Sequence, residues 1–148
     1  MGFETKAFGA QDALVAALKD AEGLEAWTID YGLPSRREEQ HIWVDERLSD
    51  WNQANDTTGL VSKQETFSIV VYIYSRLTGA SAIEQREDIR AAADIVSSVI
   101  GSAPFLGGAV FYARIAAAEF DTAFADPEGR KREGLLQLTV QCSAYLSA

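Results

Sequence analysis

An alternating apolar run near the middle of the chain constrains the fold more than any other feature. Residues 65–74 read Glu-Thr-Phe-Ser-Ile-Val-Val-Tyr-Ile-Tyr, and apolar side chains on both faces are typical of a buried strand. An amphipathic stretch from Ser81 to Gly101 follows, and a second apolar run occupies residues 109–115. This order predicts strand, helix and strand, which form the core of an α/β or α+β domain.

The stretch after the first run has helix signals at both ends. Ser81 and Glu84 have the spacing of a capping box, in which two side chains bind backbone N–H groups that the first turn leaves free. Apolar residues then recur at every third or fourth position, and Gly101 and Pro104 are typical of a helix end. These signals predict a helix over residues 82–100.

Similar patterns assign most of the remaining chain. Residues 10–22 place Leu14 and Leu18 on one helical face, and Gly23 favours a stop after them. Shorter alternating patterns predict strands over residues 26–31, 109–119 and 135–145.

Residues 41–75 are predicted to form a long two-stranded hairpin. Its tip is expected in the polar, turn-prone segment from Asn55 to Gly59. Such a hairpin would extend beyond a domain of 148 residues, and an unsupported hairpin is only marginally stable in water. Either the two helices cover both faces of the sheet within one chain, or another subunit supplies the missing cover; we favour the second.

These elements predict one domain over residues 1–148 with an α+β fold. We expect a mixed, largely antiparallel β-sheet with a long β-hairpin, flanked by two main helices at about 10–22 and 82–100.

The charge of the chain excludes some classes of partner. Thirteen basic and 22 acidic residues give a net charge of −9, which disfavours binding in nucleic-acid grooves and attachment to anionic membranes. Acidic surface residues most often serve to keep a protein soluble. The more specific alternative is a surface that DNA passes without binding. No apolar stretch approaches the roughly 20 residues of a membrane span, and the N-terminus lacks a secretory signal pattern. We therefore expect no membrane partner.

Few residues offer catalytic or metal-binding chemistry. The chain has one histidine, His41, and one cysteine, Cys142. Without a Gly-x-Ser-x-Gly motif, we expect His41 to be a surface or hairpin residue. Cys142 alternates with apolar residues and is expected to be a small buried hydrophobe. The sequence predicts no catalytic residue, cofactor or metal site, and so no enzyme, although a hydrolase built from carboxylates distant in sequence stays open.

The order of the elements is similar to that of a known family of phage proteins. The parts that carry the likeness are an N-terminal helix followed by residues 27–32 and Pro34, then residues 42–44, 67–73, 86–89 and 134–141. In this order they resemble the tail terminator and minor tail proteins of phages with long, non-contractile tails (siphovirus type). The likeness covers nearly the whole chain as an order of elements, without an invariant motif.

The resemblance implies structural work in the virion, at the junction of tail and neck, after assembly in the host cytoplasm. It implies a ring of this chain with itself, of six copies, that caps the completed tail tube, ends its polymerisation and joins it to the head–tail connector. DNA would pass through the pore without specific binding. The alternatives are another neck or tail component, and a small-molecule-binding α+β module.

For the subunit and tail contacts, residues 45–62 are the expected region, with Trp51 as anchor because tryptophan is enriched at interface hot spots. The competing interpretation of Trp51 is a core residue at a strand end. The full set of candidate interface residues is Trp43, Asp45, Arg47, Trp51, Asn55, Thr57, Leu60, Arg130 and Arg132.

Overall fold

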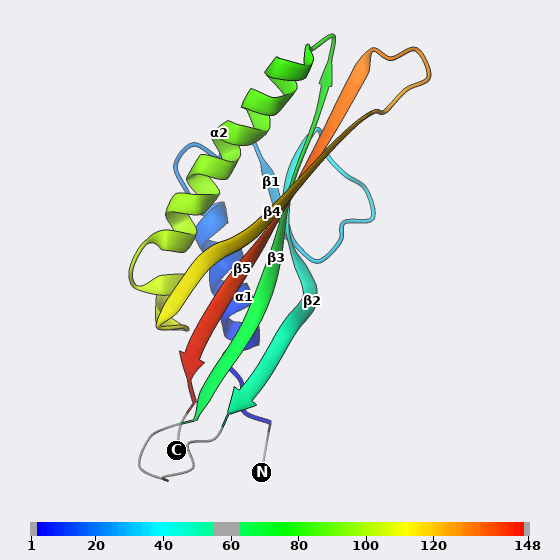
Figure 1. The fold of residues 1–148 in the computed structure, drawn as a ribbon. Coiled ribbons are helices and arrows are strands. Elements are labelled where there is room, and N and C mark those ends of the chain that lie inside the picture. The colour runs from blue at the N-terminus through cyan, green and yellow to red at the C-terminus, as the bar shows by residue number, and fades with distance from the viewer. Residues whose placement is uncertain (1–2, 55–62, 147–148) are drawn as a thin grey trace.

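A computed structural model describes residues 3–54 and 63–146 and shows one five-stranded sheet with two helices (Figure 1). The elements are α1 (Ala7–Lys19), β1 (Thr28–Tyr31), β2 (Gln40–Ala54), β3 (Gln64–Thr78), α2 (Ala82–Gly101), the short 3₁₀ helix η1 (Phe105–Gly108), β4 (Tyr112–Phe124) and β5 (Lys131–Tyr145). The strand order is β1-β2-β3-β5-β4. Only β1 and β2 pair in parallel, so the predicted mixed, largely antiparallel α+β fold is confirmed.

Tertiary contacts shift some boundaries from their predicted places. Helix α1 begins three residues earlier than expected, where the Thr5 hydroxyl oxygen accepts a hydrogen bond from the Ala7 N–H at 3.0 Å. It ends at Lys19, and Gly23 lies in the following turn with a φ of +97°. Strand β4 runs past its predicted end to Phe124 because its ladder with β5 continues to that residue.

Helix α2 and its capping box are as predicted. The Ser81 hydroxyl oxygen accepts the Glu84 N–H at 3.2 Å, and the Glu84 carboxylate accepts the Ser81 N–H at 3.1 Å. The segment Ala82–Gly108 is long and apolar enough to cross a membrane by length and composition alone. In this fold, however, the apolar face of α2 packs against β3 and β5 and buries Val96 and Ile100.

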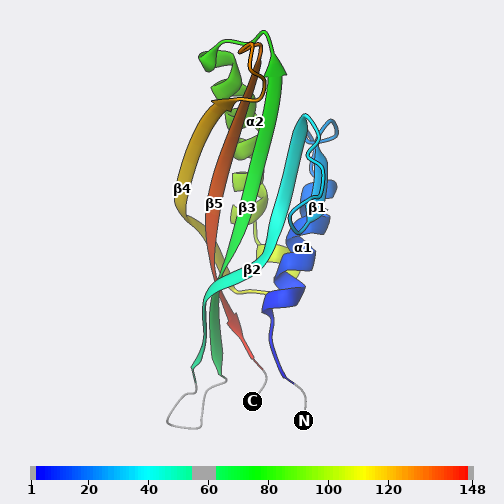
Figure 2. The same ribbon diagram turned by 90° about the vertical axis from the view of Figure 1, so that its right-hand side faces the viewer.

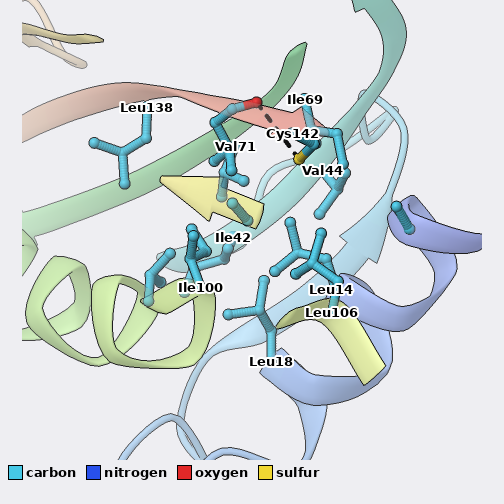
Figure 3. Close-up of a cluster of buried hydrophobic side chains, with 14 of the residues drawn as sticks. Leu14, Leu18, Ile42, Val44, Ile69, Val71, Ile100, Leu106, Leu138 and Cys142 are labelled. Atoms are coloured by element: carbon cyan, nitrogen blue, oxygen red, sulfur yellow. Dashed lines mark hydrogen bonds between the residues drawn. The ribbon is translucent and has the colours of Figure 1, made fainter. Parts of the chain in front are cut away.

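The main core lies between the sheet and the two helices (Figure 3). Strand β3 contributes Ile69 and Val71, which lie opposite Leu14 and Leu18 of α1 and Ile100 of α2. All five side chains are essentially inaccessible to solvent. Burying a large aliphatic side chain stabilises a fold by roughly 1.5–3 kcal/mol, so this layer accounts for much of the stability.

Both helices lie on the same face of the sheet, behind it in Figure 2. The interpretation in which they cover both faces is therefore wrong. On the opposite face, called the open face here, the segment of residues 32–39 covers one margin by placing Arg37 over the rings of Trp43 and Tyr74. Tyr72, farther from that segment, remains half-buried.

Candidate assembly interface

The long β2–β3 hairpin extends beyond the helical layer at the end of the molecule that holds both termini (Figure 2). Each of its strands has 15 residues, which at about 3.3 Å per residue makes each roughly 50 Å long. The hairpin prediction is thus confirmed for the two strands. Its tip, with Asn55, Thr57 and Leu60, lies outside the described residues.

A buried carboxylate holds the base of this hairpin to the N-terminal segment. Glu65 of β3 is fully buried and accepts hydrogen bonds from two neighbours on β2, the Trp51 indole N–H at 2.8 Å and the Gln53 amide at 2.7 Å. The Thr5 hydroxyl at 2.7 Å and the Lys6 backbone N–H at 2.8 Å complete the set. Four donors from two segments therefore meet on one charged side chain.

These donors decide the ionisation of Glu65. Burial alone would raise its pKa, but the hydrogen bonds from Gln53, Trp51, Thr5 and Lys6 outweigh that effect and hold the pKa below the usual value of 4.5. The carboxylate is therefore the favoured form at neutral pH. The charged Glu65 side chain accepts hydrogen bonds from both the hairpin and the residues that lead into α1, and so it holds the two together.

Trp51 contributes to this junction through its ring as well. Its indole lies 5.6 Å from the Phe3 ring and 5.7 Å from the Phe8 ring, centroid to centroid. Both phenylalanines are largely exposed, and Trp51 is half-buried against the core. Trp51 thus combines features of the two interpretations, since it packs within the chain and borders exposed aromatic surface.

Irregular pairing in β2 sets the direction of the hairpin base. The β2–β3 register shifts between Val44 and Leu48 and again between Ser49 and Asn52, and Asp50 has a φ of +50°. Bulges of this kind bend a strand and redirect its side chains. Gln11 of α1 supports the first shift, because its buried amide donates to the Asp45 carbonyl oxygen at 3.1 Å.

The other candidate interface residues do not form one surface. Trp43 is only 1% exposed and stacks on Tyr72 at 5.1 Å. This burial removes it from the directly contacting set, a correction to the prediction. Asp45 is half-buried and Arg47 exposed, both on β2.

Arg130 lies between β4 and β5 and Arg132 near the start of β5, at the end of the sheet opposite Ala54 of β2 and Gln64 of β3 (Figure 1). Arg132 donates to the Ala80 carbonyl oxygen at 3.1 Å and covers the Phe124 ring. These two arginines therefore lie far from Trp51, at the other end of the sheet.

His41 lies on the hairpin strand β2, one of its two expected places, but it is buried and not at the surface. Its Nδ1 accepts the Glu38 backbone N–H at 2.9 Å, so the other ring nitrogen, Nε2, carries the proton and donates to the Asp30 carboxylate at 2.7 Å. Both nitrogens are occupied by contacts that join the 32–39 segment to the sheet. Among residues 3–54 and 63–146, no group of three or more His, Cys, Asp or Glu side chains is placed to hold a metal ion.

Cys142 is buried in the core, as predicted. Burial raises the pKa of its thiol to about 12, so the reactive thiolate is scarce at neutral pH. We expect the native protein to react with a disulfide reagent about 10³-fold more slowly than an exposed cysteine does. A Ser97→Cys variant places a control thiol on the exposed side of α2. Rapid labelling of native Cys142, before any unfolding, would contradict this prediction.

Sequence reasoning missed Glu65 and Gln11, the polar residues that organise the junction. For Glu65 a signal was present. It shares the period-two face of Phe67 and Ile69, which are core positions, so its carboxylate had to be buried with the core.

Comparisons with known proteins add no assignment. No model of a known protein family matches the chain, and no curated protein matches it.

Proposed function

We propose that this chain is a structural phage protein that assembles as a ring, of six copies, on the completed tail tube. The ring ends polymerisation of the tube and presents a surface for head–tail joining. In this proposal the chain acts without catalysis, cofactor or membrane, in the virion at the tail–neck junction, after assembly in the host cytoplasm. The partners are the tail tube protein and the head–tail connector.

The observation that carries this proposal is the projecting hairpin with its fixed base. Glu65, Trp51 and Gln53 form a network that joins the hairpin to the N-terminal segment. Ordering these side chains costs conformational entropy, and the ordered base extends beyond the helices that would otherwise support it. A neighbouring subunit or the tube would supply the missing packing.

The charge of the chain supports the same proposal. At a net charge of −9, a ring of several copies would have a strongly negative field around its pore. DNA would be repelled from the wall and would pass without adhering. A ring that joins heads to tails without stopping tube growth would instead make the chain another neck component.

Absolute mass in solution tests the assembly step of the proposal. Light scattering coupled to size exclusion, with negative-stain images of any large species, should give a ring near six times the 16.1 kDa of one chain. A monomer that forms rings only on tail tubes also supports the proposal. A strict monomer that neither binds tubes nor forms rings contradicts it.

A further inference from the structure

Strand β4 forms the outer edge of the sheet, and an apolar groove lies beside it. The groove has a volume of about 220 Å³, and the residues that line it are Arg86, Ile89, Arg90, Ala93, Phe120 and Leu136. Phe120 is 39% exposed, and the two arginines stand on α2 at the rim. We call this groove and the β4 strand next to it the groove edge.

Within the part of the chain that the structure describes, strand β4 pairs with β5 alone, so its other side has no strand partner along 13 residues. Residues 116–124 are exposed, and four of them are alanines, which do not block an approaching chain. A long free strand edge is normally paired or covered in the functional assembly. The groove edge therefore has the features of a surface that a partner covers.

Strand β1 forms the opposite edge of the sheet (Figure 2), and the residues around it have the complementary, acidic charge. Leu33 projects there with 64% of its surface exposed. The Glu46 carboxylate lies close to Gly32. A Cβ atom placed on this glycine would be 3.8 Å from the carboxylate. The pKa of Tyr31 is raised by burial and then by the carboxylates of Glu46, Asp12 and Asp45. We call these five residues, Asp12, Tyr31, Leu33, Asp45 and Glu46, the acidic edge.

Among the described residues, the groove arginines form ion pairs with Glu87 alone. Glu87 lies 3.2 Å from Arg86 and 3.7 Å from Arg90. All three side chains are largely exposed, and surface ion pairs of this kind contribute little. Glu87 alone does not neutralise two arginines, so the groove retains positive charge for a second, acidic partner.

We propose that the groove edge of one copy binds the acidic edge of the next copy, with Leu33 in the groove and Arg86 and Arg90 against Glu46 and Asp12. This contact rests on the proposed ring and specifies how its subunits meet. A two-fold contact between two groove edges would bring arginines together, whereas the head-to-tail contact pairs opposite charges. Because each copy keeps one free edge of each kind, the contact can repeat from copy to copy, and it closes a ring where the rotation between neighbours adds up to a full turn.

Charge reversal and its rescue test the contact in the full chain. The R86E/R90E and D12K/E46K variants should each raise the concentration for half-assembly more than about tenfold, and the four changes combined should restore assembly. The K63E/K131E variant makes the same charge change as R86E/R90E at exposed positions outside both edges and should assemble normally. Equal loss in this control, or no rescue in the combined variant, would overturn the inference.

Disulfide trapping tests the contact between the two edges even if the wild-type chain is monomeric in solution. Oxidation of an L33C/A93C variant should give a ladder of linked copies, while the control L33C/Q141C, with its second cysteine on the open face of β5 and outside both edges, should not. Absence of the ladder at millimolar protein overturns the inference. If the ladder forms but tail tubes are not capped, the contact stands and the proposed function fails. If tail tubes are capped but no ladder forms, the proposed function stands and this contact fails.

Discussion

Replacing Glu65 with glutamine should lower the free energy of unfolding by roughly 2–4 kcal/mol. The carboxylate accepts four hydrogen bonds, three of them on one oxygen, Oε2. A glutamine keeps the shape but offers one acceptor oxygen, and its NH₂ group would face donors. Chemical denaturation monitored by the fluorescence of the three tryptophans and by circular dichroism measures the loss.

The pH dependence of stability provides a second readout for the same residue. Because the folded-state pKa of Glu65 is lowered, its contribution is fully present above the unfolded pKa, near 4.5, and is lost as the pH falls through the folded value. The Glu65→Gln variant should therefore lose less stability than the wild type below about pH 4.5. The matched control Glu119→Gln, at an exposed position on β4, should leave stability within about 0.5 kcal/mol. An unchanged stability in Glu65→Gln would show that the network does not hold the hairpin base.

Replacing Phe67 with alanine should lower the free energy of unfolding by about 3–5 kcal/mol. Phe67 is 1% exposed near the start of β3 and lies directly opposite Cys142 of β5. Truncation removes a large buried area and leaves a cavity that a sheet with neighbours on both sides cannot close. Equilibrium unfolding in urea, with the slope compared between variants, measures the change.

Phe120→Ala is the matched control for Phe67→Ala. Phe120 is the same residue type on the edge strand, partly exposed in the groove, so its truncation should cost only about 1 kcal/mol. Its main effect should be on subunit assembly, because the groove would lose its wall. Similar destabilisation by both variants would contradict the assignment of β4 as an edge that is free in the single chain.

Local signals explain which elements could be predicted from the sequence. The capping box of Ser81 and Glu84 acts within one turn, so the start of α2 could be placed to the residue. The alternation in residues 65–74 likewise reflects the period of a strand and predicted most of β3. Helices and strands whose boundaries depend on local sequence signals were therefore predicted well.

Features that depend on the path of the chain could not be predicted. Nothing in the pattern of β2 shows that Arg37 and Glu38 fold back to bury Trp43 and His41, because the covering segment looks like an ordinary solvated loop. The side of the sheet that each helix occupies is also decided by connections between elements.

Termination of a growing tail tube is the most direct test of the central claim. Purified chain is added to polymerising tail tube protein encoded by the same genome, and tube lengths and ends are measured in negative-stain images. The account predicts that growth stops and that one end of each tube carries a ring of density. Tubes that grow to the same length, with bare ends, at saturating concentrations of the chain would contradict it.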